Sequence, residues 1–498
     1  MTTVRITSDP MSLDDLVAIV DGAQVNLDDA VRERMAGSRA VIDQALAASD
    51  AVYGLTTHVG HGRDIRLTDE EIRDQQMFLI RSHSGGVGPA MPVPLVRAAL
   101  AVRLNGLARG GSGASPAAAD VLVAMLNRAV HPVVPGVGSV GAGDLSLLAG
   151  VAQVAVGMGR ATYQGEIMSG GEALARAGIE PLTPSGKDGL ALISSNAVSI
   201  GHAALVVARA HRVAQLSDVA AALTMEALGA NPSILHPAVA AAKAIPGQRA
   251  AIDQLRQLLA GGSLMEGGAA NSVQDALSVR VVPQVHGALR HFLAAFRDAV
   301  DQELNAASDN PLVVTADQAV ISNGNFHPMV MAIAADALRV AVTHVGQLSE
   351  RRMAHLWEAY FAGMDSGRPP VVPAGLALRY PAAAVFAELK HTAAPGTLDT
   401  PPQDLGIEDH GTGAPLTVRL TDRALELLED LLAIETLIAR DVLAVAKDPG
   451  PRLGSGTSAA LHAITQAVAE GSAPEVVHLR VKQHLAEFAK SELVRRSG

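Results

Sequence analysis

The sequence predicts a mainly α-helical protein built around a bundle of long helices. Hydrophobic residues make up 49% of the 498 residues, but aromatic residues make up only 2%. The core must therefore be filled mainly by Ala, Val and Leu, and alanine favours helices because it loses no side-chain entropy on entering one. Apolar residues also recur at helical spacing over four long segments. These segments are 201–228, 282–304, 329–356 and 417–446.

The clearest of these patterns, at 417–446, is apolar on more than one side. A long helix of this kind seldom stands alone in water, so we expect a bundle whose outer faces are covered by other subunits. Pro449 and Pro451 are expected to end this helix, with a short helical tail after them. The chain is thus divided into a loop-rich N-terminal region at 1–195, a central long-helix bundle at 196–450 and a helical tail at 451–498.

Charge and cysteine content exclude several classes of protein. The formal net charge is −11, and no run of Lys or Arg is long enough to bind a phosphate backbone, so we expect no nucleic-acid partner. The absence of cysteine excludes disulfides and thiolate metal sites, and it fits a cytoplasmic protein. Residues 1–9 do not resemble a signal peptide, and no run approaches about 18 apolar residues, so no membrane span is expected.

Two motifs are set aside because of their context. Residues 136–141 match the pattern GxGxxG, but prolines flank the strand that a dinucleotide site requires, so we expect no nucleotide cofactor. His58 and His61 lie close together beside Asp64 and could hold a metal. Without a third ligand at helical spacing we interpret them as polar loop residues and expect no metal.

The stretch from His131 to Leu145 carries the most specific resemblance. It reads His-Pro-Val-Val-Pro-Gly-Val-Gly-Ser-Val-Gly-Ala-Gly-Asp-Leu. This resembles the signature Pro-x-x-Pro followed by Gly-Ser-Val-Gly-Ala-Ser-Gly-Asp-Leu of the aromatic amino acid ammonia-lyases and aminomutases. Other motifs of that family are matched in the same order. They lie at 53–62, 82–88, 103–113, 274–280, 283–287, 308–312, 324–327 and 408–410.

The resemblance implies an all-α, aspartase-like fold in which long helices form the core of a homotetramer. In that family each active site is assembled from loops of several subunits around the central helices. A homotetramer agrees with the excess of apolar helix surface noted above, and the loop-rich region at 1–195 is then the N-terminal catalytic region.

The family's reaction needs an electrophile, because the β-proton of an amino acid is barely acidic and an amine is a poor leaving group. The resemblance implies that an internal Ala-Ser-Gly would cyclise to a methylidene-imidazolone, with the serine supplying the methylidene. Here Ala142 is followed directly by Gly143 and Asp144, so this loop is a remnant without the serine. Ser139 is a poor substitute, because Val140 rather than a glycine would supply the ring nitrogen. We therefore expect no cofactor.

Two further family positions differ in this chain. Leu277 stands where a second tyrosine is expected. Ser194-Ser195-Asn196-Ala197 stands where the family has Asn-Gly-Thr-Gln, whose amides contact the cofactor and the substrate. All of the altered residues serve the imidazolone, so their loss is consistent with its absence.

The resemblance assigns catalytic and carboxylate-binding roles to retained residues. Tyr53 matches the family's catalytic base; its phenol, with a pKa near 10 when free, needs a lowered pKa to act at neutral pH. Arg280 matches the arginine that binds the substrate carboxylate, a task that suits its planar fork, and Gln274 belongs to the same wall. The alternatives are a packing tyrosine and a structural ion pair.

Further matches indicate the substrate. Ser82 and His83 match a pair that accompanies histidine rather than Phe or Tyr as substrate, and Glu408 stands where histidine-specific members place an acid near the imidazole. Asn325 and Phe326 match pocket residues. A polar contact for the Ser82–His83 pair and a packing role for Phe326 are the alternatives.

We therefore expect a lyase that eliminates or adds a group across Cα–Cβ of a carboxylated, possibly histidine-like small molecule, without the imidazolone. A better leaving group than ammonia, or an already activated substrate, would relieve the demand for an electrophile. The first rival hypothesis is a conventional histidine ammonia-lyase or aminomutase. The second is a non-catalytic tetrameric homologue, against which the joint retention of Tyr53, Arg280 and Glu408 argues.

Overall fold

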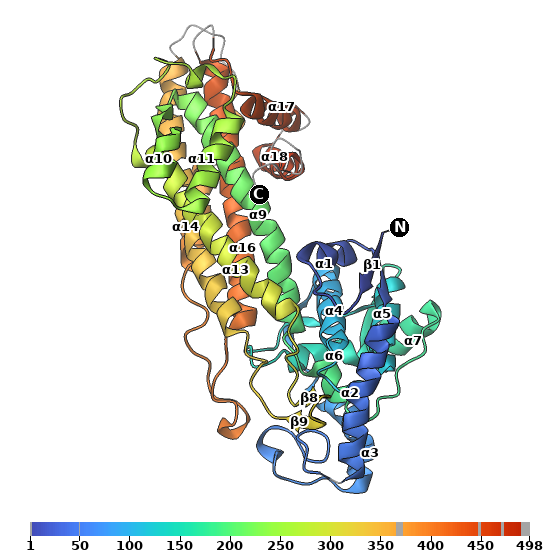
Figure 1. Cartoon of the computed structure of the whole chain (residues 1–498). Coiled ribbons are helices and arrows are strands. Elements are labelled where there is room, and N and C mark those ends of the chain that lie inside the picture. Colours follow the sequence, from blue (N-terminus) through green and yellow to red (C-terminus); the bar gives the residue numbers. More distant parts are fainter. Residues whose placement is uncertain (1, 49, 365–371, 447–449, 470–472, 490–498) are drawn as a thin grey trace. The chain divides into compact units, whose positions relative to one another are not determined.

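The computed structural model describes residues 2–48, 50–364, 372–446, 450–469 and 473–489 (Figure 1). The chain is mainly helical, as the sequence predicts. It divides into two compact units. The first comprises Met1–Val206, Arg297–Ile333 and Pro395–Arg419, and the second comprises Val207–Phe296, Ala334–Ala394 and Leu420–Gly498.

The four long helices predicted from apolar spacing are all present. They are α9 (Ala197–Leu228), α13 (Val282–Leu304), α14 (Met329–Met364) and α16 (Ala414–Val445). The bounds of α13 coincide with the predicted segment, whereas α14 runs eight residues beyond the predicted end at 356. Each of these helices contributes residues to both units.

The first unit otherwise contains shorter helices, and the local sequence explains where one near the candidate site begins. α3 (Asp69–His83) starts at a capping box in which the Thr68 side chain accepts the Glu71 N–H and the Glu71 carboxylate accepts the Thr68 N–H. The backbone N–H groups of Thr68 and Glu71 would otherwise have no partner at the start of the helix. The other helices here are α1 (Leu13–Val20), α2 (Asp29–Ala47), α4 (Val93–Ala108), α5 (Pro116–Asn127), α6 (Leu145–Ala155), α7 (Gly170–Ala177) and α8 (Asp188–Ile193).

Small sheets, which the sequence did not predict, connect the loops of the first unit. β3 (Val87–Ala90) pairs antiparallel with β5 (Pro135–Val137), which holds the segment after α3 beside the start of the loop that resembles the family signature. The others among the described residues are the parallel pair β1 (Thr3–Ile6) and β2 (Gln24–Leu27), the antiparallel sheet of β4 (His131–Pro132), β6 (Arg160–Tyr163) and β7 (Glu166–Ser169), and the hairpin of β8 (Leu312–Val314) and β9 (Ala319–Ile321).

The second unit is a bundle in which the long helices run side by side (Figure 1). The predicted helical tail is present as α17 (Ser455–Ala469) and α18 (Pro474–Phe488); Pro449 lies outside the described residues. The remaining helices are α10 (Pro237–Ala242), α11 (Pro246–Leu258), α12 (Leu277–Arg280) and α15 (Arg379–Thr392).

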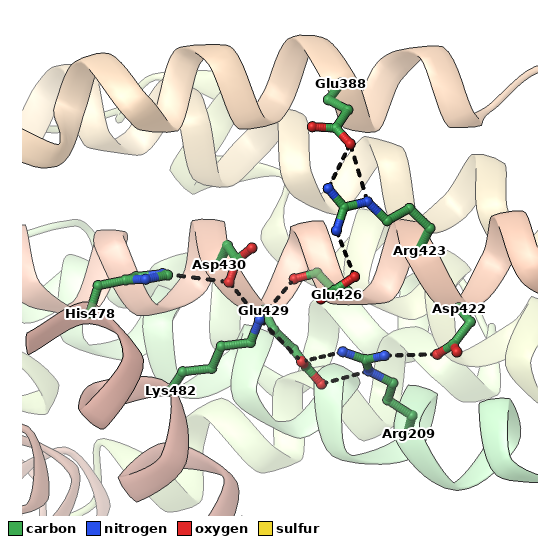
Figure 2. A network of polar contacts seen from close by, with 9 residues as sticks. All are labelled: Arg209, Glu388, Asp422, Arg423, Glu426, Glu429, Asp430, His478 and Lys482. Atoms are coloured by element: carbon green, nitrogen blue, oxygen red, sulfur yellow. Dashed lines mark hydrogen bonds and ion pairs between the residues drawn. The ribbon is translucent and has the colours of Figure 1, made fainter. Parts of the chain in front are cut away.

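Ion pairs connect α9 and α18 to α16 (Figure 2). Arg209 of α9 donates to both carboxylate oxygens of Glu429, at 3.0 and 2.7 Å, and to Asp422 at 2.8 Å. Lys482 of α18 donates to Asp430. Bidentate pairs that are partly buried have the geometry in which an ion pair contributes most. The network therefore fixes how α9 and α18 pack on α16.

The burial of α16 corrects the reason given above for expecting partner subunits. Its apolar residues Leu427, Leu431 and Ile438 are buried within this chain. The exposed apolar surface lies instead on α14, where Val330, Ile333, Val340 and Phe361 are exposed. The helical spacing of apolar residues does not by itself show which helix lies at the centre of a bundle, because central and outer helices have the same spacing.

Two helical segments are long and apolar enough to cross a membrane by length and composition alone. These are Asp188–Leu228 and Met329–Met364. The most apolar window of the first is 89% buried inside the protein, as in the core helix of a globular fold, and that of the second is 56% buried. Length and composition are therefore weak evidence for a span here.

Candidate active site

A cavity of about 920 Å³ lies in the first unit and collects most of the residues predicted to act on a substrate. Its walls come from the loop after Val52, the end of α3, the loop before α6 and the segment around 403–408. Seven residues singled out in the sequence line it: Tyr53, Ser82, His83, Ala142, Gly143, Phe326 and Glu408. The structure thus joins positions up to 355 residues apart, 408 − 53, in one site.

The other four predicted residues do not line the cavity. Asp144 is fully buried behind it, where its carboxylate accepts the N–H and the hydroxyl of Ser199, at 2.8 and 3.0 Å. Asn325 is exposed, and its N–H donates to the side chain of Asn323. Gln274 and Arg280 belong to the second unit.

Arg280 is the last residue of the one-turn helix α12. It is partly buried, and no ion pair joins it to an acidic residue in the described part of the chain. The alternative of a structural ion pair therefore has no partner among the described residues. Gln274 is exposed in the loop before this helix.

The phenol of Tyr53 does not have the lowered pKa that a base at neutral pH needs. Burial raises its pKa, and the carboxylates of Glu408 and Asp404 raise it further. The N–H of Gly60, which donates to the phenol oxygen at 2.9 Å, and the charge of Arg63 act in the opposite direction. In the free chain the phenol therefore holds its proton, because two negative charges disfavour a third.

Ser82 and His83 form a polar pair at the end of α3. His83 Nδ1 lies 3.0 Å from the carbonyl oxygen of Leu79 and 3.2 Å from Ser82 Oγ. A carbonyl can only accept, so Nδ1 carries a proton and, in the neutral ring, Nε2 is an acceptor. Ser82 is exposed and His83 is partly buried in this chain, so the polar contact between them is not a fully buried one. Burial and Asp404 raise the pKa of the Glu408 carboxyl in the same cavity.

The loop that carries Ala142 and Gly143 is held by its own side chains. Ser139 Oγ accepts the N–H of Gly141 and donates to the carbonyl oxygen of Gly143, each at 3.0 Å. Gly143 has a φ of 82°, and a Cβ there would lie 2.5 Å from Leu145 Cδ1. The position therefore admits only glycine.

The segment Ser194–Ala197 supports this loop from behind. The carbonyl of Ser195 accepts the N–H of Asp144 at 2.7 Å. Both polar atoms of the Asn196 side chain are buried without a hydrogen-bond partner among the described residues. An unpaired buried amide costs about 1–3 kcal/mol of folding stability, so stability does not explain why residue 196 is an asparagine.

Sequence reasoning missed Asp404 and undervalued His61. Both line the cavity, and His61 Nδ1 lies 2.6 Å from a carboxylate oxygen of Asp404. The position of Asp404, four residues before Glu408 in the sequence, is the signal that could have identified it. Phe78 and Gln403 were missed as well. Within the described residues, no group of three or more metal-binding side chains is placed to hold an ion, and no Lys or Arg lines the cavity.

Comparison with known proteins places this geometry in context. The family model described as aromatic amino acid lyase matches residues 11–466. A histidine ammonia-lyase from Anaeromyxobacter sp. (strain K) is 38% identical over 461 residues, covering 89% of this chain and 90% of that protein.

Solved structures agree over the full length. Ergothionase, the ergothioneine-degrading enzyme from Treponema denticola, solved with desmethyl-ergothioneine sulfonic acid, superposes with a TM-score of 0.90 at 26% identity, covering 99% of this chain and 100% of that one. Histidine ammonia-lyase from Trypanosoma cruzi gives a TM-score of 0.88 at 29% identity, covering 100% and 96%.

Proposed function

The chain belongs to the aromatic amino acid lyase family and is a lyase, and we propose that it eliminates a group across the Cα–Cβ bond of a carboxylated, histidine-like molecule without a methylidene-imidazolone, or catalyses the reverse addition. The observation that carries the proposal is the loop at the cavity wall. Ala142 is joined directly to Gly143, and both line the cavity.

The residues of this loop do not fit the imidazolone. No serine stands between Ala142 and Gly143 to become the methylidene. Ser139 is the nearest serine before them, and its hydroxyl already bridges Gly141 and Gly143 within the loop. We therefore derive no step through this cofactor.

Without an electrophile, the leaving group must be better than ammonia from an unactivated amino acid. Ergothioneine is a histidine derivative with a trimethylated α-nitrogen, which leaves as a neutral tertiary amine without gaining a proton. Two observations support a substrate of this kind. The chain superposes on ergothionase, and His83 and Glu408 in the cavity suit an imidazole-type ring. We propose a histidine betaine of this class as substrate.

A permanent cation also suits the electrostatics of the cavity. Two carboxylates, Asp404 and Glu408, line it without a Lys or Arg among the described residues, and aromatic rings of Tyr53, Phe78 and Phe326 line it too. Carboxylates and aromatic faces are the groups that attract a quaternary ammonium. Its positive charge would lower the pKa of Tyr53 when bound, so that the phenol loses its proton to solvent, and the resulting phenolate then accepts the β-proton while the C–N electron pair leaves with the amine.

Arg280 supplies the carboxylate clamp in this proposal. It belongs to the second unit and does not line the cavity in the first unit, and the resemblance implies sites assembled from several subunits. We propose that Arg280 of another copy completes the site. The exposed apolar residues of α14, such as Val340, are the surface proposed to bury against that copy in a homotetramer.

The assembly is tested by sedimentation at micromolar concentration, where a tetramer is expected and a stable monomer of 51.2 kDa would exclude it. Val340→Glu is expected to break the assembly, and Glu358→Gln, an exposed change on the same helix, serves as its control. A cytoplasmic location stays a prediction.

The chemistry is tested with two matched substrates. Ergothioneine and L-histidine both carry an imidazole-type ring and a carboxylate, but they differ in leaving group and in the sulfur on the ergothioneine ring. Release of a tertiary amine from the first and slow or absent ammonia release from the second is expected. The peptide 131–145 should have the mass of its unmodified sequence. Ammonia from L-histidine together with a dehydrated peptide would instead establish a conventional histidine ammonia-lyase, the alternative that the 38% identical relative favours.

A further inference from the structure

One carboxylate holds the loop that follows Tyr53 at two points. Asp404 Oδ2 accepts the backbone N–H of His61 at 2.7 Å, and Asp404 Oδ1 lies 2.6 Å from His61 Nδ1. The two oxygens of one side chain thus fix both the backbone and the ring of His61. Asp404 is 343 residues away along the chain, so nothing local requires this pairing.

The backbone on both sides is shaped for this approach. A Cβ at Gly60 would lie 1.8 Å from Asp404 Oδ2, so only glycine allows the carboxylate to come so close. Asp404 and Leu405 have φ values of 48° and 55°, which residues with a side chain seldom adopt. A non-glycine residue held there is strained, and such strain often marks a functional constraint.

The pairing leads directly to the phenol. The N–H of Gly60, the residue before His61, donates to the Tyr53 oxygen at 2.9 Å. Asp404, Gly60, His61 and Tyr53 all line the cavity. Fixing His61 therefore fixes the donor that orients the phenol.

We infer that Asp404 is a positioning residue, which clamps Gly60–His61 so that the Gly60 N–H holds the Tyr53 hydroxyl at the reacting carbon. This inference rests on the proposed function, because it takes Tyr53 to be the proton-transferring group. An exposed ion pair of this kind contributes little to stability. Its removal is therefore expected to affect turnover and not folding.

The first test uses turnover of ergothioneine and L-histidine by the full-length protein. Asp404→Ala and His61→Ala are each expected to lower kcat by about 10- to 100-fold with a smaller change in KM, because a small misplacement of a reacting group has that effect. The double variant should be no worse than either single one. Asp64→Ala is the control, because Asp64 is an exposed acid of the same loop whose carboxylate lies 3.7 Å from Arg63 Nε.

A conservative change separates positioning from chemistry at His61. Asparagine keeps a donor to the Asp404 carboxylate in place of Nδ1, so His61→Asn is expected to recover most of the turnover lost in His61→Ala. If His61→Asn is as inactive as His61→Ala, the imidazole itself is chemically required and the inference is wrong. Gly60→Ala should lower kcat in the native protein. When Asp404→Ala is already present, adding Gly60→Ala should lower kcat much less.

Two readouts do not depend on the substrate. The Gly60 N–H hydrogen bond lowers the pKa of Tyr53 by more than the Asp404 charge raises it, so release of the clamp in Asp404→Ala should raise that pKa, measured as the tyrosinate absorbance that Tyr53→Phe abolishes. Amide exchange in the peptide around Gly60 should become faster in Asp404→Ala than in Asp64→Ala. Unchanged values of both would overturn the inference even if neither substrate reacts. Turnover that survives Tyr53→Phe would instead overturn the proposed function.

Discussion

Arg352 of α14 and Glu435 of α16 form a fully buried, bidentate ion pair, with Nε–Oε1 and Nη2–Oε2 distances of 2.6 and 2.9 Å. The Glu435 carboxylate also accepts the hydroxyl of Thr224 from α9 at 2.6 Å. Arg352 Nη1 donates to the carbonyl of Ser278 at 3.3 Å. One ion pair thus joins three long helices of the second unit to α12, the one-turn helix that ends in Arg280.

Arg352→Met is predicted to destabilise the protein strongly. It leaves the Glu435 carboxylate buried without its cation, which costs about 3–5 kcal/mol. Arg351→Met is the matched control, because the neighbouring Arg351 is exposed and its buried partner Glu350 keeps a second cation, Arg379, at 2.7 Å; it should cost about 0–1 kcal/mol. Urea unfolding measures both, and equal losses would mean that the buried pair has no special weight.

Arg280→Ala is predicted to weaken substrate binding. Losing a charge-assisted bidentate contact with the carboxylate should cost about 2–4 kcal/mol in kcat/KM, mostly through KM. Arg297→Ala removes an exposed arginine whose nearest acid, Asp301, is 3.7 Å away, and it should leave the kinetics unchanged. Unaltered kinetics in Arg280→Ala would show that Arg280 is structural.

Tyr53→Phe is predicted to lower kcat by about 100-fold or more while the melting temperature stays near that of the native protein. The ring is kept, and only the proton-carrying oxygen and its bond from Gly60 are removed. Tyr163→Phe, in the hairpin of β6 and β7, is the control. A normal rate in Tyr53→Phe would move acid–base catalysis to His83 or Glu408.

Glu303 of α13 is predicted to make stability fall as the pH rises. Burial raises its pKa to about 7, so the folded chain holds this proton more tightly than the unfolded chain, whose pKa is near the ordinary value of about 4.3. The contribution is complete below the unfolded pKa and is lost as the pH rises through about 7.

Glu303→Gln removes this dependence. The variant should be more stable than the native protein at pH 8, by about 1–3 kcal/mol, and nearly equal to it at pH 4. Asp298→Asn, an exposed acid on the same helix, provides the comparison. A constant difference between Glu303→Gln and the native protein at both pH values would contradict the prediction.

Most of the helical architecture could be predicted from the sequence, because a helix records its buried face at a period of 3.6 residues within a short window. The segment at 282–304 was delimited at both ends for this reason. The order of short motifs also determined the family, and the direct Ala142–Gly143 junction is visible without any structure. The roles of Gln274, Arg280 and Asn325 in substrate binding remain predictions.

Only the tertiary structure decided which surfaces are buried and which charges meet. The apolar pattern of α16 proved to be internal and that of α14 partly exposed. Burial raises the pKa of Tyr53, and Glu408 and Asp404 raise it further because they come close to it from positions more than 340 residues further along the chain. Such distances depend on how every intervening element packs, and no local pattern in the sequence encodes them.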